Sequence, residues 1–361
     1  MKKVLALLLS AIMIFALCAC GSSAPAQTEA PAAPAEAAKA DTPASSGVNE
    51  YGIDVDAIDA VNYSMGDPAT SGTFLTENAQ YFCDTLKEIT GGKMVVDLYA
   101  DGLLGTEEAL MTNIQIGSLE MADFSSTFAN LVKHAGIFDF PYFITDRSQI
   151  DLLEKGGVID EIRKEAESYN IKLIAMNENG FRQITNNVRP IVEPDDLKGI
   201  VIRTPSNSLR VKTFETFGAT PVAISFSELY QSLSQGICNA QENPVSQVIS
   251  AQLYDFQNYV AISNHVYTPG WICMNLDLYN SLSDAQKAAV DLAGKMTTAH
   301  VYEVAADVDA EMLQQCIDKG MEVSEVNIDA FRAKVMPLWD EFADNVGGAE
   351  YVKLAKDALG Y

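Results

Sequence analysis

The chain has 361 residues, with 24 lysines and arginines against 49 aspartates and glutamates, so its formal net charge is −25 at pH 7. The sequence has no basic patch, which excludes nucleic acid and anionic membrane surfaces as main partners. A pocket for an anion must therefore be built locally, from the few arginines of an otherwise acidic chain.

The N-terminal segment is typical of an exported lipoprotein. Two lysines precede an apolar run from Val4 to Leu17, which is too short for a membrane span and has the flanks of a secretory signal. The run ends in Leu-Cys-Ala-Cys20-Gly, which resembles a bacterial lipobox with Cys20 lipidated; a cleaved signal with an incidental cysteine is the alternative. We predict a lipoprotein signal peptide at 1–19 and a lipidated, flexible tether at 20–58, rich in Ala, Pro, Ser and Thr.

This N-terminus also predicts the location of the protein. It would lie outside the cytoplasm, in the periplasm or on the outer face of the cytoplasmic membrane, and would touch the membrane only through its lipid anchor. Because each buried CH₂ of a lipid chain contributes about 0.8 kcal/mol, an anchor with several chains is stable.

Four cysteines remain beyond the export region: Cys83, Cys238, Cys273 and Cys316. They are widely spaced and form no CxxC pair, so zinc spacing is absent, and we predict no metal and no cofactor. Exported chains can form disulfides, but scattered cysteines in a large domain also serve as small buried hydrophobic residues. The sequence leaves both possibilities open.

From residue 61 onward, strand patterns alternate with helix patterns. Strands are predicted at Asn62–Met65, Met94–Tyr99 and Leu119–Phe124. A helix with apolar residues at spacings of three and four is predicted at Thr73–Ile89, and a second helix ends at Ile116. Such alternation indicates βαβ units and an α/β fold with a mostly parallel sheet.

The second half continues in the same way. Strands are predicted at Lys172–Met176 and Ile200–Arg203. Ser206 is expected to cap the next helix, and Ser225 with Glu228 is expected to form a capping box that opens another.

A long helix is predicted near the C-terminus. Ser283 and Gln286 form a possible capping box, and the helical stretch that they open runs to about Lys319. A helix of about 35 residues spans roughly 50 Å, which is longer than one lobe. About 310 residues follow the tether, and a single core stops growing near that size, so we predict two lobes crossed by this helix. Residues 323–361 read as helical, with Pro337 as an interruption.

Arg203 stands out because it directly follows the apolar strand residues Ile200–Ile202. In a parallel α/β sheet, the carboxyl end of a strand opens into the ligand crevice. The planar guanidinium of arginine suits a carboxylate held by two parallel hydrogen bonds. Pairing of Arg203 with the nearby Asp195 or Asp196 is the alternative.

Short motifs follow one another in a specific order along residues 60–320. They are Gly102-Leu-Leu-Gly105-Thr-Glu, Asp139-Phe-Pro141-Tyr-Phe, Gly180-Phe-Arg182-Gln-Ile-Thr, Asp196-Leu-Lys-Gly-Ile-Val-Ile-Arg203-Thr-Pro, Gly218-Ala-Thr-Pro221, Phe226-Ser-Glu-Leu-Tyr230, Gln241-Glu-Asn243-Pro244 and Asn264-His265. With these motifs the chain resembles the extracytoplasmic solute receptors of tripartite ATP-independent periplasmic (TRAP) transporters. The resemblance implies a two-lobed periplasmic-binding-protein-like α/β fold, with mixed, mostly parallel sheets flanked by helices and a long helix shared by both lobes.

The resemblance also implies roles for individual residues. Arg203 matches the strand-end arginine that grips the ligand carboxylate, and Arg182 matches a second, more peripheral arginine. Asn243 matches an asparagine whose amide can donate to the same carboxylate. Ser206 and Phe226 match positions that line the pocket.

Three further residues complete the predicted site. Glu107 and Ser125 fall where the family discriminates the far end of the ligand, and Trp271 is a candidate pocket wall. One departure concerns the turn before Gln241: the family has Asp-Gly or Asp-Ala there, whereas this chain has Asn239-Ala240. The turn is expected to persist without that negative charge.

Structural roles remain open for most of these residues. Arg182 could belong to a purely structural ion pair, and Asn243 could shape the turn before Pro244. Phe226 and Trp271 could be core residues. Glu107 opens a helix, where an acid favours the helix dipole.

The predicted organisation has five parts. They are the signal peptide 1–19, the tether 20–58, lobe I at 59–178 plus 269–308, lobe II at 179–268 plus 309–336, and a C-terminal helical segment at 337–361. The predicted function is capture of a small organic acid by the arginine–carboxylate pair with lobe closure, followed by delivery to TRAP membrane permease subunits.

An enzyme is not predicted. Only three histidines are present, with no metal-type pair, and the chain has neither a Gly-x-Ser-x-Gly elbow nor a phosphate loop. The alternatives are an ABC-type or sensor-linked binding lipoprotein, and a secreted α/β enzyme.

Overall fold

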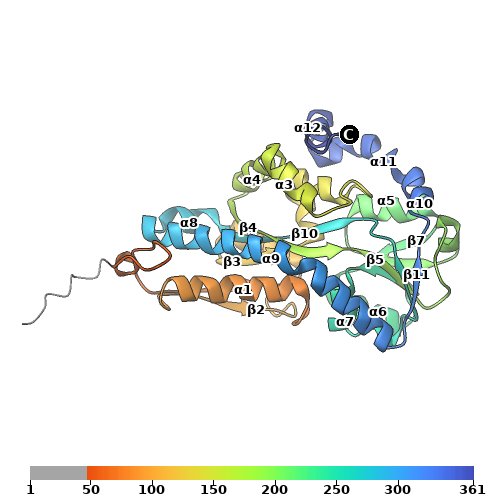
Figure 1. Cartoon of the computed structure of the whole chain (residues 1–361), viewed down its shortest axis with the longest axis horizontal. Coiled ribbons are helices and arrows are strands. Elements are labelled where there is room, and N and C mark those ends of the chain that lie inside the picture. The colour runs from red at the N-terminus through yellow and green to blue at the C-terminus, as the bar shows by residue number, and fades with distance from the viewer. Residues whose placement is uncertain (1–46) are drawn as a thin grey trace, which may run out of the picture. The chain divides into compact units, whose positions relative to one another are not determined.

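The computed structural model describes residues 47–361, and Figure 1 shows its helices and strands. The predicted signal peptide, the lipidation site Cys20 and most of the predicted tether lie outside the described residues. Within 47–361, no helix combines the length and the apolar character needed to cross a membrane. Two β-sheets organise this part of the chain; the first lobe is built on the five-stranded sheet and the second lobe on the six-stranded sheet.

The first lobe contains a sheet with the strand order β2-β1-β3-β10-β4. Its strands are β1 Val61–Gly66, β2 Met94–Tyr99, β3 Met121–Phe124, β4 Ile171–Phe181 and β10 Tyr267–Asn275. Strand β1 pairs in parallel with β2 and β3, whereas β10 runs antiparallel to β3 and β4. A strand from late in the chain therefore completes the first sheet.

Helices cover both faces of the first sheet, with α1 and α4 on opposite sides in Figure 1. The helices of this lobe are α1 Phe74–Ile89, α2 Glu107–Gln115, α3 Ser148–Lys155, α4 Val158–Ser168 and α8 Leu276–Ser281. Helix α1 agrees with its predicted range because the local signals are strong. The Thr73 hydroxyl accepts a hydrogen bond from the Thr76 backbone N–H, and an apolar face is buried against the sheet.

The second lobe contains a mixed sheet with the order β11-β9-β5-β8-β6-β7. Its strands are β5 Gln183–Asn186, β6 Val201–Thr204, β7 Thr220–Ala223, β8 Ala240–Asn243, β9 Tyr259–Ile262 and β11 Glu322–Glu325. Its helices are α5 Ser208–Phe217, α6 Leu229–Ser234 and α7 Val245–Ser250. Strand β6 is parallel to β7 and β8, while β5 is antiparallel to β8 and β9. The predicted two-lobed α/β fold is confirmed.

Helix α9, Asp284–Asp318, joins the lobes. Both hydrogen bonds of the predicted capping box are present: Ser283 Oγ accepts from the Gln286 N–H, and Gln286 Oε1 accepts from the Ser283 N–H. The helix packs against α1 and β4 of the first lobe and against α7 of the second. Figure 1 shows α9 running along both lobes.

The C-terminal region contains three helices, α10 Ile328–Val335, α11 Leu338–Glu341 and α12 Ala349–Leu359, with Pro337 between the first two. Helix α12 packs against α3 and α4. Short 3-10 helices lie at Val55–Ala57, Ser126–Asn130, Lys133–Asp139, Pro194–Leu197, Phe226–Glu228, Leu253–Asp255 and Ala343–Val346.

Two predicted helix caps are wrong. Asn207, not Ser206, caps α5, since its Oδ1 accepts from the Arg210 N–H at 2.9 Å. The Ser225 side chain caps no backbone N–H among the described residues; its hydroxyl donates to the Glu228 side chain at 2.7 Å, and a 3-10 turn precedes α6.

The predicted tether also differs at its end. Residues 47–58 pack on the first lobe, where Ile53 and Ile58 are buried in the core and Asn49 Nδ2 donates to the Ile89 carbonyl at 2.6 Å. The two isoleucines explain the difference, because a flexible tether would leave them in water. The four cysteines described are free and buried, as small hydrophobic residues are.

Candidate functional site

A cavity of about 220 Å³ lies between the two lobes. One wall comes from the segments that follow β1 and β3 and from the start of α2, and the other from the segments that follow β6, β7 and β8. Seven of the eight predicted ligand-binding residues line it: Glu107, Ser125, Arg182, Arg203, Ser206, Phe226 and Asn243. The cavity lies where α/β sheets generally bind ligands, beyond the carboxyl ends of strands.

Arg203 is the charged centre of the second-lobe wall. It lies on β6 between β7 and β8 and is only 2% exposed. Its Nε donates to the Ile224 carbonyl at 2.8 Å, and its guanidinium carbon lies 6.0 Å from the ring centroid of Phe226. Among residues 47–361, no group accepts a hydrogen bond from Nη1 or Nη2 of Arg203, and no carboxylate forms an ion pair with it.

The charge of Arg203 is therefore not neutralised locally. Burial lowers the pKa of Arg203 to about 10, while the more distant Glu242 opposes that shift. The side chain remains cationic at neutral pH. The alternative in which Asp195 pairs with Arg203 is wrong, because Asp195 pairs with Lys198 and Lys334 instead.

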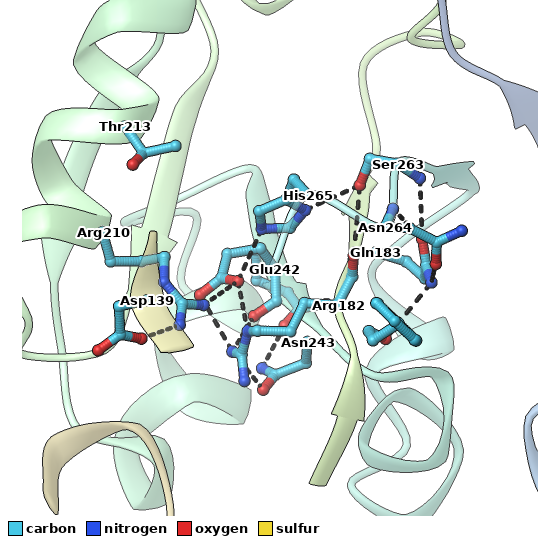
Figure 2. A network of polar contacts seen from close by, with 12 residues as sticks. Asp139, Arg182, Gln183, Arg210, Thr213, Glu242, Asn243, Ser263, Asn264 and His265 are labelled. Atoms are coloured by element: carbon cyan, nitrogen blue, oxygen red, sulfur yellow. Dashed lines mark hydrogen bonds and ion pairs between the residues drawn. The ribbon is translucent and has the colours of Figure 1, made fainter. Parts of the chain in front are cut away.

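Arg182, unlike Arg203, is paired with an acid of the protein, as Figure 2 shows. It lies between β4 and β5, where the chain passes from the first sheet to the second. Its Nε donates to Glu242 Oε2 at 2.5 Å, and its Nη2 donates to Glu242 Oε1 at 3.0 Å and to Asn243 Oδ1 at 2.7 Å. Most of its donors are thus committed to the protein, which fits the structural alternative for this residue.

Glu242 is the centre of this buried network. Arg210 donates to it from α5 at 2.9 Å and donates also to Asp139 at 2.5 Å, while His265 Nε2 lies 3.1 Å from it. Burial alone raises the pKa of Glu242, but the charges of Arg182 and Arg210 outweigh burial and bring the pKa below its usual value. Burial lowers the pKa of His265, which favours its neutral form. Two arginines and two acids therefore balance one another.

Asn243 ends β8 beside this network. Its Oδ1 accepts from Arg182, and its Nδ2 donates to Gln241 Oε1 at 2.6 Å. One amide hydrogen of Nδ2 is left for the cavity. The departure from the family at Asn239 has a local explanation, since Asn239 Oδ1 accepts from the Val201 N–H at 3.0 Å and holds the turn against β6.

The first-lobe wall presents an acid. Glu107 begins α2, and its Oε1 accepts from the Ser125 N–H at 2.5 Å. Burial raises the pKa of Glu107 to about 7, with smaller contributions from the charges of Glu108 and Asp67. Ser125 Oγ accepts from Asn179 Nδ2 at 2.8 Å.

Sequence reasoning missed Asn179 and Gln247, which also line the cavity. Asn179 lies on β4 and accepts from Gln247 Nε2 of α7 at 3.1 Å, so the pair connects the two lobes beneath the ligand space. Both residues are amides in ordinary strand and helix positions. No local sequence signal marks them, because their proximity depends on how the lobes meet.

Trp271 does not line the cavity, so this predicted site residue is wrong. It is 2% exposed on β10 and packs against Phe128 and Phe138, with ring centroids at 5.7 and 5.6 Å. The core alternative is correct, because β10 is an interior strand between β3 and β4 and its side chains are covered on both faces.

Comparison with known proteins identifies the family. A family model described as bacterial extracellular solute-binding protein, family 7, matches residues 65–345. The chain belongs to this family. The chain is 31% identical to the 2,3-diketo-L-gulonate-binding periplasmic protein YiaO of Escherichia coli K12, over 69% of this chain and 75% of that protein.

Solved structures of family members are similar throughout the folded part. A TRAP periplasmic solute-binding protein of Polaromonas sp. JS666 bound to D-erythronate has a TM-score of 0.77 and 26% identity, covering 82% of this chain and 98% of that one. The sugar acid binding protein DctPAm of Advenella mimigardefordensis in complex with galactonate has a TM-score of 0.80 and 25% identity, covering 84% and 99%. The resemblance to TRAP receptors is confirmed, and family 7 proteins are solute-binding receptors, not enzymes.

Proposed function

We propose that this protein is the extracytoplasmic receptor of a TRAP transporter and captures a small organic acid through Arg203. The guanidinium forms two parallel hydrogen bonds with the ligand carboxylate. Asn243 and Nη1 of Arg182, which donates no hydrogen bond among residues 47–361, add donors beside it. The observation that carries this proposal is that Arg203 is buried and lines the cavity, yet no carboxylate among residues 47–361 pairs with it.

Lobe closure is the second part of the proposal. Two hydrogen bonds support it: Ser250 Oγ donates to the Gly72 carbonyl at 2.6 Å, and Asn130 Nδ2 donates to the Ser206 carbonyl at 2.7 Å. Each bond joins one lobe to the other, and Ser206 lines the cavity. A ligand that prefers the closed form shifts the population toward it, and the permease subunits would then recognise that form.

The N-terminal features belong to the same proposal. A lipid on Cys20 would keep the receptor at the membrane that holds its permease. The lobe boundaries predicted from the sequence, with lobe I at 59–178 plus 269–308 and lobe II at 179–268 plus 309–336, provide the hinged pair that closure requires.

A screen of organic acids by thermal denaturation tests this function. A ligand that binds only the folded protein raises stability by RT ln(1 + [L]/Kd), about 2.7 kcal/mol at a hundredfold excess over Kd. We expect at least one carboxylate to raise the melting temperature, and calorimetry to give one site per chain with the acid recovered unchanged. Turnover of the acid would support the secreted-enzyme alternative, and binding only of uncharged solutes would reject the proposal.

A further inference from the structure

Four charged side chains line the cavity: Arg182, Arg203, Glu107 and Glu108. Arg182 belongs to the balanced group around Glu242, in which Asp139 and Arg210 supply the other two charges. The second-lobe wall therefore contributes one positive charge, that of Arg203. One positive charge matches one carboxylate of a ligand.

The opposite wall contributes negative charge and no cation. Glu107 and Glu108 are the first two residues of α2, and no ion pair involves either of them among the described residues. Glu107 has one oxygen bound to the Ser125 N–H, and Thr127 lies close enough to its carboxylate to lower its pKa. Glu108 is exposed, so water screens its charge more strongly.

The remaining polar groups on both walls are mostly hydroxyls. Ser125, Ser126 and Thr127 lie on the first-lobe wall, and Ser206, Ser225 and Ser227 lie on the second-lobe wall. A hydroxyl both donates and accepts hydrogen bonds, and the carboxylate of Glu107 accepts from a ligand hydroxyl. The cavity is thus chemically suited to a polyhydroxylated acid with its carboxylate at Arg203.

We propose that Glu107 sets the charge of the solute, so that the receptor takes singly charged polyhydroxy acids and discriminates against dicarboxylates of the same length. The inference rests on the proposed function, because it assumes that the first carboxylate lies at Arg203. A second carboxylate at the far end of the ligand faces Glu107 with no cation nearby. A hydroxymethyl group at that position donates a hydrogen bond to Glu107 instead.

Protonation of Glu107 limits this discrimination at lower pH. The titratable groups that act on Glu107 are Glu108 on its own helix, Asp67 at the end of β1 and Asp123 on β3, and Arg203 lines the opposite wall of the cavity. Burial holds the pKa of Glu107 near 7, so a dianion can bind when Glu107 takes up a proton. Each pH unit above the pKa makes that uptake about tenfold less favourable, because one pKa unit is 1.36 kcal/mol.

Calorimetry with matched acids tests the inference. The pairs are D-erythronate with meso-tartrate and D-gluconate with D-glucarate, in which a terminal hydroxymethyl group is replaced by a carboxylate. At about pH 8 we expect the wild-type protein to bind one of the monoanions at least about tenfold more tightly than its dianionic partner. The Glu107→Gln variant, which keeps a hydrogen-bonding side chain, should lose this preference by gaining affinity for the dianion. The preference of the wild-type protein should shrink at about pH 6.

The Glu303→Gln variant is the control, and it should retain the preference because Glu303 is an exposed residue of α9 that does not line the cavity. Equal affinity of the wild-type protein for the two acids of a pair, or no gain of dianion affinity in Glu107→Gln, would overturn the inference. If no acid of the two pairs binds while another carboxylate does, the inference fails and the proposed function stands. If no carboxylate of any kind binds, the proposed function itself fails.

Discussion

The site contains three buried arginines, and their environments separate structure from function. Arg182 and Arg210 each have acids within ion-pair distance, whereas Arg203 has none among the described residues. An unpaired buried charge costs stability, since the protein replaces little of the hydration that the charge loses. We interpret this cost as the consequence of keeping Arg203 ready for a ligand, which is a common trade between stability and function.

Replacing Arg203 by alanine should affect ligand affinity and the stability of the unliganded protein in different ways. A hydrogen bond to a charged group contributes about 1.5–3 kcal/mol, so Arg203→Ala should weaken binding of the cognate acid on the order of tenfold to several hundredfold. The free energy of unfolding without ligand should stay the same or rise. Calorimetry and denaturant titration measure the two quantities.

Arg182→Ala is the comparison for this experiment. It leaves the buried Glu242 with one arginine fewer, and breaking such a pair typically costs about 3–5 kcal/mol of stability. If Arg203→Ala bound the acid as tightly as the wild-type protein, the role assigned to Arg203 would be wrong.

A second residue-scale feature is the buried acid at the end of β1. Asp67 is fully buried; its Oδ1 accepts from the Ala69 N–H at 2.7 Å, and its Oδ2 has no hydrogen-bond partner among residues 47–361. Burial raises the pKa of Asp67 to about 7. The folded state therefore holds a proton that the unfolded state releases above about pH 4.

Stability should consequently fall as the pH rises from about 4 to 7, and this group contributes a few kcal/mol to that fall. Asp67→Asn keeps the acceptor for Ala69 and removes the titration, so it should flatten the pH dependence of the unfolding free energy. Denaturant titrations at pH 5 and pH 8 give the comparison, with the exposed Asp307→Asn as the control. An unchanged slope in Asp67→Asn would show that Asp67 is ionised in the folded protein.

At this scale the sequence predicts residues whose signal is local. Arg203 is recognisable because it follows a strand, and its position at a strand end is a local property. The pairing of Arg182 with Glu242 is not predictable in this way, because it joins residues 60 positions apart across two strands. Trp271 shows the same limit, since composition marks it as unusual and only the sheet order shows that it is buried.

At the scale of elements, α9 is the piece that connects the lobes. Gly294 lies where the helix crosses β4, and a Cβ added there would lie 2.5 Å from the Ile174 carbonyl oxygen and 3.1 Å from its Cγ2. Glycine is about 1 kcal/mol less favourable than alanine in a helix, so packing and propensity oppose each other at this position. We expect the steric contact to outweigh the gain in helix propensity, because a strand carbonyl cannot move aside as a side chain can.

Gly294→Ala should therefore lower the melting temperature even though it improves helix propensity. The expected loss is about 1–3 kcal/mol, typical of overpacking. The reverse exchange at an exposed position of the same helix, Ala306→Gly, measures propensity alone and should cost about 1 kcal/mol. A higher melting temperature for Gly294→Ala would show that α9 and β4 are less tightly packed than the structure indicates.

Capping signals show why some elements were predicted correctly and others were not. Ser283 caps its helix as predicted because its partner Gln286 lies three residues away, and Thr73 caps α1 with the same spacing to Thr76. Ser225 satisfies the same spacing, but its hydroxyl bonds the Glu228 carboxylate and leaves the backbone N–H groups to a 3-10 turn. The spacing of two residues identifies a candidate capping pair. It does not determine whether the serine hydroxyl bonds the partner's side chain or its backbone N–H.

At the scale of the whole folded part, the account depends on two lobes that meet across the cavity. The alternation of strands and helices predicted the α/β class. The predicted lobe I included residues 269–308, but the place of β10 between β3 and β4 was not predicted, because strand order depends on contacts far apart in the sequence. Two of the connections between the sheets, β4 to β5 and β9 to β10, carry Arg182 and His265, so the network around Glu242 lies where the chain passes between the sheets.

Closure should be sensitive to the hydrogen bonds that join the two lobes. Ser250→Ala removes the hydrogen bond to the Gly72 carbonyl, and a neutral bond contributes about 0.5–1.5 kcal/mol. We expect acid binding to weaken about two- to tenfold, mainly through faster dissociation measured by surface plasmon resonance. Ser234→Ala, which removes a hydroxyl bonded within α6, should leave both rates unchanged. Equal dissociation rates for Ser250→Ala and the wild-type protein would contradict a closed state held by this bond.

The most direct test is a crystal structure with the acid that gives the largest thermal stabilisation. We predict that the two oxygens of its carboxylate lie about 2.7–2.9 Å from Nη1 and Nη2 of Arg203, with the rest of the molecule extending toward Glu107. A carboxylate bound elsewhere in the cavity, with Arg203 making no contact to it, would contradict the account.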